Sequence, residues 1–138
     1  MKAMILLAHG SRRKESAQEI KSVADSLEAQ AKEKGQFDAV RPAFMQFCGP
    51  NFYQVIEELI QKSEAGTQDS SNNLVKQDIL LKEVVVLPYF ISAGSHVSED
   101  IPELIKKARE KYPDISFTVT PHLGKFQGLQ RLMLEETY

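Results

Sequence analysis

The stretch that decides the fold reads Glu83-Val84-Val85-Val86-Leu87-Pro88-Tyr89-Phe90. It is rich in β-branched residues, and an apolar run of this length between polar neighbours is typical of a strand covered on both faces. We therefore expect it to be a central strand of a sheet. Residues 91–100 predict a long loop, which ends where Asp100 and Glu103 form a capping box for a helix.

Short apolar runs alternate with longer amphipathic stretches on both sides of this strand. The apolar runs predict further strands at residues 3–8, 39–47 and 115–119. Pro42 lies inside the second run, and a proline indicates an irregular or edge strand. Strands alternating with helices predict an α/β fold of three layers, α/β/α, with a four-stranded parallel sheet and right-handed crossovers.

The amphipathic stretches predict where the other helices lie. One helix opens with Ser16 and Glu19 as a capping box, and a second starts at residues 49–51. A last helix carries the apolar residues Phe126, Leu129, Leu132 and Met133.

The chain of 138 residues has the length of one domain. Residues 64–78 are polar and rich in Gly, Ser and Asn, and they predict a flexible surface loop. Neither side of this loop offers a separate core, so we expect one domain over residues 1–138.

The composition narrows the possible partners and the compartment. The formal charge of -2 argues against bulk electrostatic binding to nucleic acid or an anionic membrane. No apolar run is long enough to span a bilayer, and the run at residues 3–8 is too short for a signal peptide core. Cys48 is the single cysteine, which excludes an intrachain disulfide and fits a reducing compartment. We therefore expect a cytoplasmic protein.

All three histidines follow predicted strands: His9 after the first, His96 in the loop after the third, and His122 after the fourth. Ligands of open parallel sheets bind outside the carboxyl ends of the strands, so all three imidazoles are expected at the binding edge. Neutral imidazole binds first-row divalent metals. A histidine after a strand is also often a plain loop residue that forms hydrogen bonds, and the spacing alone does not decide between these readings.

Two of these histidines lie in segments suited to an anionic ligand. Residues Gly10, Ser11, Arg12 and Arg13 follow His9 and combine a flexible glycine with a hydroxyl and two guanidinium groups, which bind carboxylates or phosphates. Ser92, Ala93, Gly94 and Ser95 precede His96, and such small residues let backbone amides approach a ligand. The alternative readings are a solvated turn and an ordinary β-to-α connection. Neither segment matches a nucleotide-binding glycine pattern.

The segment Leu6-Leu7-Ala8-His9-Gly10-Ser11-Arg12 resembles the opening motif of the CbiX and SirB sirohydrochlorin chelatases. Residues 87–102, from Leu87-Pro88-Tyr89-Phe90 through Gly94-Ser95-His96-Val97, resemble the second signature of this family. The resemblance implies a chelatase-like domain that inserts a divalent metal into sirohydrochlorin for cobalamin or sirohaem synthesis. It also implies a homodimer of the small CbiX type, with no organic cofactor.

By this resemblance, His9 and His96 are the metal-binding and catalytic pair, and the segments beside them grip the carboxylates of the tetrapyrrole. Cobalt is the expected metal, with iron or nickel as alternatives. His122 is a secondary candidate, for a structural role or one at the substrate edge. Many relatives carry an acidic residue after the second strand, where this chain has Gln46. A neutral amide neither ligates metal nor accepts a pyrrole proton as a carboxylate does.

Two other functions remain open at this stage. A non-catalytic metal or tetrapyrrole carrier would keep the pocket while lacking the acidic counterpart of Gln46. A phosphate-binding α/β enzyme would use His9 and Arg12, but that function leaves the segment around His96 unexplained.

Overall fold

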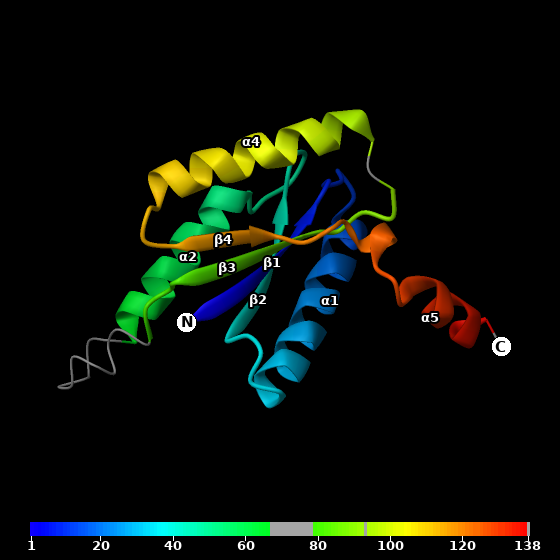
Figure 1. The fold of residues 1–138 in the computed structure, drawn as a ribbon, viewed down its shortest axis with the longest axis horizontal. Helices are drawn as coiled ribbons and strands as arrows, with labels where there is room; N and C mark the ends of the chain where they lie inside the picture. The colour runs from blue at the N-terminus through cyan, green and yellow to red at the C-terminus, as the bar shows by residue number, and fades with distance from the viewer. Residues whose placement is uncertain (67–78, 93, 138) are drawn as a thin grey trace.

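A computed structural model describes residues 1–66, 79–92 and 94–137 (Figure 1), and at His96 and Val97 it describes the backbone. Most of the loop expected at residues 64–78, and Ala93 of the expected binding segment, lie outside the described residues. Residues 64 and 65 are not part of a loop, because they form the last turn of a helix.

Four parallel strands form one sheet in the order β2-β1-β3-β4. They are β1 (Lys2–Ala8), β2 (Ala39–Phe44), β3 (Glu83–Pro88) and β4 (Ser116–Val119). The expectation of a four-stranded parallel sheet is confirmed, with β3 in an inner position and β2 at an edge. The second strand is shorter than predicted, because the chain turns away after Phe44.

Helices cover both faces of the sheet, as Figure 1 shows. Helix α1 (Lys14–Glu33) packs on one face through Ala24 and Ala31. Helices α2 (Phe52–Ala65) and α4 (Ser95–Lys111) pack on the other face. The step from β1 to β2 runs in one direction along the sheet, whereas the steps from β2 to β3 and from β3 to β4 run in the opposite direction. Right-handed crossovers in opposite directions place their helices on opposite faces, so α1 lies on one face and α2 and α4 lie on the other. The three-layer prediction is confirmed.

The inner strands are apolar on both faces because both faces are buried. Ile5, Leu6 and Leu7 of β1 are each 0% exposed. Ile5 and Leu7 face α2 and α4, whereas Leu6 faces α1. The residue that follows β1 is therefore attached to the best-buried strand of the sheet.

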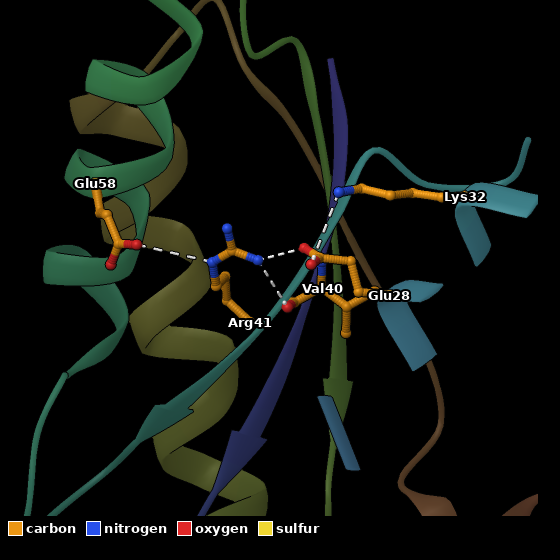
Figure 2. A network of polar contacts seen from close by, with 5 residues as sticks. All are labelled: Glu28, Lys32, Val40, Arg41 and Glu58. Carbon is orange, nitrogen blue, oxygen red and sulfur yellow. Dashed lines mark hydrogen bonds and ion pairs between the residues drawn. The ribbon is translucent and has the colours of Figure 1, made fainter. Parts of the chain in front are cut away.

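The outer edge of β2 is covered by an ion-pair network (Figure 2). Arg41 of β2 pairs with Glu28 of α1, and its Nε lies 3.7 Å from Glu58 of α2. Glu28 also accepts a hydrogen bond from the Val40 backbone N–H at 3.1 Å. Together with Pro42, which has no N–H to donate, these contacts protect an edge where another strand could otherwise add.

The beginnings of two helices differ from the predictions. Helix α1 begins at Lys14 and its N-cap Arg13 makes no side-chain cap, so the Ser16 and Glu19 capping box is wrong. A turn just before the helix precedes its first residue. In this turn, Ser11 Oγ accepts a hydrogen bond from the Arg13 backbone N–H at 3.1 Å.

Helix α4 begins at Ser95, so the Asp100 and Glu103 capping box and the loop up to residue 100 are also wrong. The carbonyl of Gly94 accepts the N–H and the Oγ–H of Ser98, each at 3.1 Å, and these bonds close a turn ahead of Pro102. Helix α2 begins where expected, with a reciprocal capping box between Asn51 and Gln54.

The C-terminal segment departs from a single helix with a buried face. A short 3-10 helix, η1 (Leu123–Lys125), comes first, and α5 (Leu129–Glu136) follows it. Phe126 lies between the two and packs with the α1-side core, so its assignment to the last helix is wrong. Leu132 and Met133 do lie in α5 but are 51% and 58% exposed. Figure 1 shows α5 projecting away from the sheet.

No helix in the described part of the chain combines the length and the apolar character needed to cross a membrane.

Candidate functional site

The strand order makes the carboxyl edge between β1 and β3 a topological switch point. The chain leaves β1 toward α1 on one face and leaves β3 toward α4 on the other, so the two connections diverge at the carboxyl edge. Open α/β sheets bind ligands at such a switch point. His9 follows β1 directly, and the backbone of His96 lies in the first turn of α4, after β3. The structure thus puts His96 at a helix N-terminus and not in a loop.

The His9 side chain is exposed and its ring has two neighbours. It meets the ring of Phe90 edge-on, with 5.9 Å between ring centroids and an interplanar angle of 83°. Its Nδ1 lies 3.5 Å from Nε2 of Gln46. Gln46, where the resemblance leads us to expect an acidic residue, is therefore a direct neighbour of His9.

The segments after β1 and β2 are fastened together by their backbones. The Gln46 N–H donates to the His9 carbonyl at 3.1 Å. Gly10 has a φ of +103°, and a Cβ there would stand 1.8 Å from the Gln46 carbonyl oxygen. Only glycine combines that φ with so close an approach. The glycine that the sequence suggested as a flexible ligand-binding element thus has a packing role, which fixes Gln46 beside His9.

A second glycine fastens the segment of His122 to the connection after β3. The Gly124 N–H donates to the Phe90 carbonyl at 2.9 Å. A Cβ at Gly124 would lie 1.6 Å from the Ile91 carbonyl oxygen. His122 is half-buried at the N-cap of η1. Its segment therefore joins the edge that carries His9, through Phe90, although Phe90 and Gly124 were not singled out in the sequence as parts of the site.

Two arginines and a serine follow His9 in the chain. Arg12 and Arg13 are exposed, and neither forms an ion pair with the described residues. The Arg12 guanidinium carbon lies 5.0 Å from the ring centroid of Phe47, which holds the cation by its aromatic face. Such a guanidinium keeps all its N–H donors free for a carboxylate.

The N-terminus of α4 supplies a second anion-binding element. Its N-cap is Gly94, and Ser95 is its first residue. The first N–H groups of a helix have no partner within the helix, and the helix dipole is positive at this end. The small residues before His96 thus lead into backbone donors that can bind carboxylates.

A cavity of about 240 Å³ adjoins His9 on the α1 side of the sheet. It is lined by residues of β1, α1 and the following segments: Ala8, His9, Gly10, Ser11, Ser16, Ala17, Ile20, Phe44 and Tyr89. Pockets for drug-sized ligands hold about 300–1,000 Å³. A large planar ligand would therefore extend beyond this cavity, across the exposed edge.

Among the described side chains, no three of His, Cys, Asp and Glu gather so as to hold a metal ion. The His96 side chain does not belong to that set. His9 and Gln46 thus offer one imidazole and one amide, and a metal site needs further donors at this edge.

Comparison with known proteins gives a family match over almost the whole chain. A family model described as CbiX matches residues 3–137. The chain is 30% identical over 105 residues to the sirohydrochlorin cobaltochelatase of Methanopyrus kandleri, an alignment covering 76% of this chain and 59% of that protein. It is 29% identical over 121 residues to the chloroplastic sirohydrochlorin ferrochelatase of Arabidopsis thaliana, covering 88% and 44%. The chain spans about half the length of these curated relatives.

The fold has a counterpart among solved structures. The sirohydrochlorin chelatase SirB from Bacillus subtilis subspecies spizizenii, in complex with cobalt, superposes with a TM-score of 0.67 at 22% identity. The superposition covers 99% of this chain and 50% of that one. The fold described above thus corresponds to about half of a longer chain.

Proposed function

This chain belongs to the CbiX family, and from that membership we propose that it inserts a divalent metal ion into sirohydrochlorin. Similar proteins are named for cobalt and for iron insertion. Co²⁺ is the metal that we propose first, with Fe²⁺ and Ni²⁺ as alternatives. The ion and the tetrapyrrole are both substrates, and the proposed reaction uses no organic cofactor.

The observation that carries the proposal is the place of His9 and His96 at the switch point of the sheet. His9 follows β1 and His96 follows β3, the two adjacent strands whose connections diverge at the carboxyl edge. In the proposed mechanism, the two imidazoles hold the incoming ion with open coordination positions. One of them then accepts a pyrrole proton as the ion passes to the ring nitrogens.

The groups around this pair are suited to the many carboxylates of sirohydrochlorin. Ser11, Arg12 and Arg13 follow His9; both arginines are exposed and accessible to a ligand, and Ser11 is half-buried. After β3, we propose that Ser92, Ala93, Gly94 and Ser95 bring the N-terminus of α4 to the substrate. Charge-assisted hydrogen bonds from both sides would orient the ring over His9.

The test is an insertion assay that follows sirohydrochlorin absorbance with Co²⁺, Fe²⁺ and Ni²⁺ in turn. We expect His9→Ala and His96→Ala to reduce the rate at least about a hundredfold, a typical contribution of one proton-transfer group. Far-UV circular dichroism should be unchanged, because His9 is exposed and lies beyond the end of β1. His122→Ala tests the secondary candidate, and it should keep most of the rate because His122 is not one of the two proposed metal ligands. Full activity in both the His9 and His96 variants would refute the assignment.

The neutral amide of Gln46 beside His9 favours a second candidate, a metal or tetrapyrrole carrier. A carrier would shift the absorbance of sirohydrochlorin, or bind Co²⁺, without accelerating insertion above the rate in buffer. The assay above therefore separates the two functions directly.

We also propose that the chain acts as one CbiX domain, as a homodimer in the cytoplasm. The match over residues 3–137 supports one domain. The homodimer rests on the resemblance to the small form of CbiX. The lone Cys48 supports a reducing compartment.

A further inference from the structure

Phe47 adopts a backbone conformation that is rare for a bulky residue. Its φ is +70°, and among the described residues it is the only one other than glycine with a positive φ. The Cys48 N–H donates to the Gln46 carbonyl at 2.9 Å, so residues 46–48 form a γ-turn centred on Phe47. A γ-turn with a positive φ at its centre is the rare and strained form. Such strain persists only where the surrounding structure holds it.

Backbone hydrogen bonds on both sides of Phe47 hold this turn in place. The Gln46 N–H donates to the His9 carbonyl at 3.1 Å. The segment that contains the turn is closed at its base, because the Phe44 N–H donates to the Pro50 carbonyl at 2.9 Å. The turn is therefore fastened to His9, and Phe47 is held next to the candidate site.

The conformation of Phe47 does not serve the core of the protein. Phe47 is 57% exposed, so most of its apolar surface gains nothing from folding. A glycine in the same turn would avoid the strain, and a polar side chain would avoid the exposed apolar surface. Strained residues cluster at active sites and at sites that clamp ligands. The combination of strain and exposure therefore indicates a binding role for the ring.

A guanidinium group lies against this ring. The Arg12 guanidinium carbon is 5.0 Å from the ring centroid of Phe47, and Arg12 forms no ion pair with the described residues. An aromatic ring stacks on flat conjugated ligands, whereas a guanidinium binds carboxylates through parallel hydrogen bonds. The pair is thus suited to a ligand that is both flat and anionic. A phosphate or a flexible carboxylate would use Arg12 alone and leave the ring unused.

We propose that the ring of Phe47 is a stacking surface for the face of the tetrapyrrole, and that Arg12, held against the same ring, binds one of its carboxylates. This inference rests on the proposed function for the identity of the ligand. The cavity of about 240 Å³ at His9 is too small for the whole macrocycle, which therefore extends across the exposed edge. Phe47 lies at that edge, one residue after Gln46, the neighbour of His9.

The first experiment titrates the full-length protein with sirohydrochlorin in the absence of metal and follows the absorbance of the ligand. We expect Phe47→Ala to raise the dissociation constant about tenfold, which is within the range for the loss of one aromatic stacking contact. Phe47→Leu keeps the apolar bulk without the aromatic face and should raise it at least about threefold. Phe47→Trp should keep the natural affinity. Unchanged binding by Phe47→Ala would overturn the inference.

Phe37 provides a matched control at the opposite edge of the sheet. Its ring also lies against a cation, with the Lys2 Nζ 5.2 Å from the ring centroid. Phe37 precedes β2 and Lys2 begins β1, so both residues lie at the amino ends of the strands. We expect Phe37→Ala to bind sirohydrochlorin with the natural affinity. An equal loss of affinity in Phe37→Ala would show that the Phe47 result does not report a local contact, and would overturn the inference.

A double variant separates stacking on the ring from support of Arg12. If the ring only positions the guanidinium, Phe47→Ala has no further effect once Arg12 is replaced. A ring that contacts the macrocycle still contributes, so adding Phe47→Ala to Arg12→Ala should raise the dissociation constant at least about threefold more. No further loss in the double variant would overturn the stacking role.

The backbone strain is tested by a second pair of variants. Phe47→Ala keeps a Cβ in the turn, whereas Phe47→Gly removes it and tolerates the positive φ. We expect Phe47→Gly to unfold at a higher urea concentration than Phe47→Ala, although both lack the ring and should bind sirohydrochlorin equally weakly. If Phe47→Gly unfolds at no higher urea concentration, the strained turn from which the inference starts is overturned.

The two proposals fail in different ways. A natural protein that inserts metal with a KM for sirohydrochlorin that Phe47→Ala leaves unchanged would overturn the inference and leave the proposed function intact. A protein that binds sirohydrochlorin through Phe47 but never accelerates insertion would overturn the proposed function and leave the stacking surface standing.

Discussion

Gln46 is the residue on which the chemistry of His9 depends most directly, since its amide nitrogen lies 3.5 Å from His9 Nδ1. An amide brings no charge to an ion held by His9, whereas a carboxylate at the same place would. Metal affinity at this edge should therefore be lower than a glutamate would give.

We expect Gln46→Glu to bind Co²⁺ about tenfold more tightly, which corresponds to about 1.4 kcal/mol. Titration calorimetry on the full-length protein measures the change. Gln46→Leu is the control, because it keeps a similar volume without an oxygen and should bind no more tightly than the natural protein. Equal affinity in the Gln and Glu forms would show that residue 46 lies outside the coordination sphere.

Gly10 is needed for its backbone, which allows the segments after β1 and β2 to touch. We expect Gly10→Ala to destabilise the protein by at least about 2 kcal/mol, from its positive φ and from the approach to the Gln46 carbonyl. Urea unfolding provides the measurement. Gly128→Ala should change stability by no more than about 0.5 kcal/mol, because nothing lies within 4 Å of its added Cβ.

At the scale of elements, β2 is held at its open edge by charged side chains (Figure 2). Burial raises the pKa of Glu28, but the Val40 N–H and the Arg41 guanidinium outweigh it, so the pKa lies below its ordinary value of 4.5. Glu28 is thus an ionised, well-partnered acceptor that fastens α1 to β2.

Replacing Glu28 by Gln should cost about 1–2 kcal/mol, because the Arg41 partner loses its charge-assisted bond. Glu58→Gln removes the longer and more exposed contact to the same guanidinium and should cost no more than about 0.5 kcal/mol. Thermal unfolding of the pair at neutral pH distinguishes them. Equal losses would mean that Arg41 is held by both carboxylates alike.

The strands could be predicted from the sequence better than the helix ends, and the reason is physical. Burial on both faces makes β1 and β3 continuously apolar, and Pro42 indicates that β2 lies at an edge. The order of apolar residues therefore predicts where the strands lie and which of them are central. The starts of α1 and α4 depend on single turns, which are closed by hydrogen bonds to Ser11 Oγ and to the Gly94 carbonyl. The spacing of apolar residues does not predict such turns. The last helix was predicted with a stripe of apolar residues, but that pattern cannot tell a core-facing stripe from one left exposed.

At the scale of the whole molecule, two polar contacts set limits on the pH range of stability. Glu28 is ionised in the fold, and Tyr112 at the end of α4 donates its hydroxyl to Glu57 of α2. Burial and the bond to Glu57 raise the pKa of Tyr112 to about 12 from an ordinary value of 10. The folded state thus favours a charged Glu28 and a neutral Tyr112.

The sign of each effect follows from linkage. The contribution of Glu28 is complete above pH 4.5 and declines as the pH falls through its lower folded pKa. The contribution of Tyr112 is complete below pH 10 and is lost between pH 10 and about 12. Unfolding free energies measured across this range should show both declines. Tyr112→Phe should reduce the decline in unfolding free energy at alkaline pH, and Glu28→Gln should reduce the decline at acid pH. If a variant leaves its decline unchanged, the replaced residue does not cause it.

The arrangement of the site could be predicted only in part. Parallel topology alone brings the segments of His9, Gln46 and His122 to one edge, and the structure places them there. The contact between Gln46 and His9, and the ring contact between His9 and Phe90, depend on how the connections pack. Neither follows from residue spacing.

The burial of β1 has a consequence for how metal binding should look in a calorimeter. Because β1 is paired on both sides and 0% exposed at Ile5, Leu6 and Leu7, the backbone of His9 is ordered when the chain folds. An ion bound there meets a ligand whose backbone is already in place. Its binding entropy should therefore report mainly the water released from the ion, and its heat capacity change should be small.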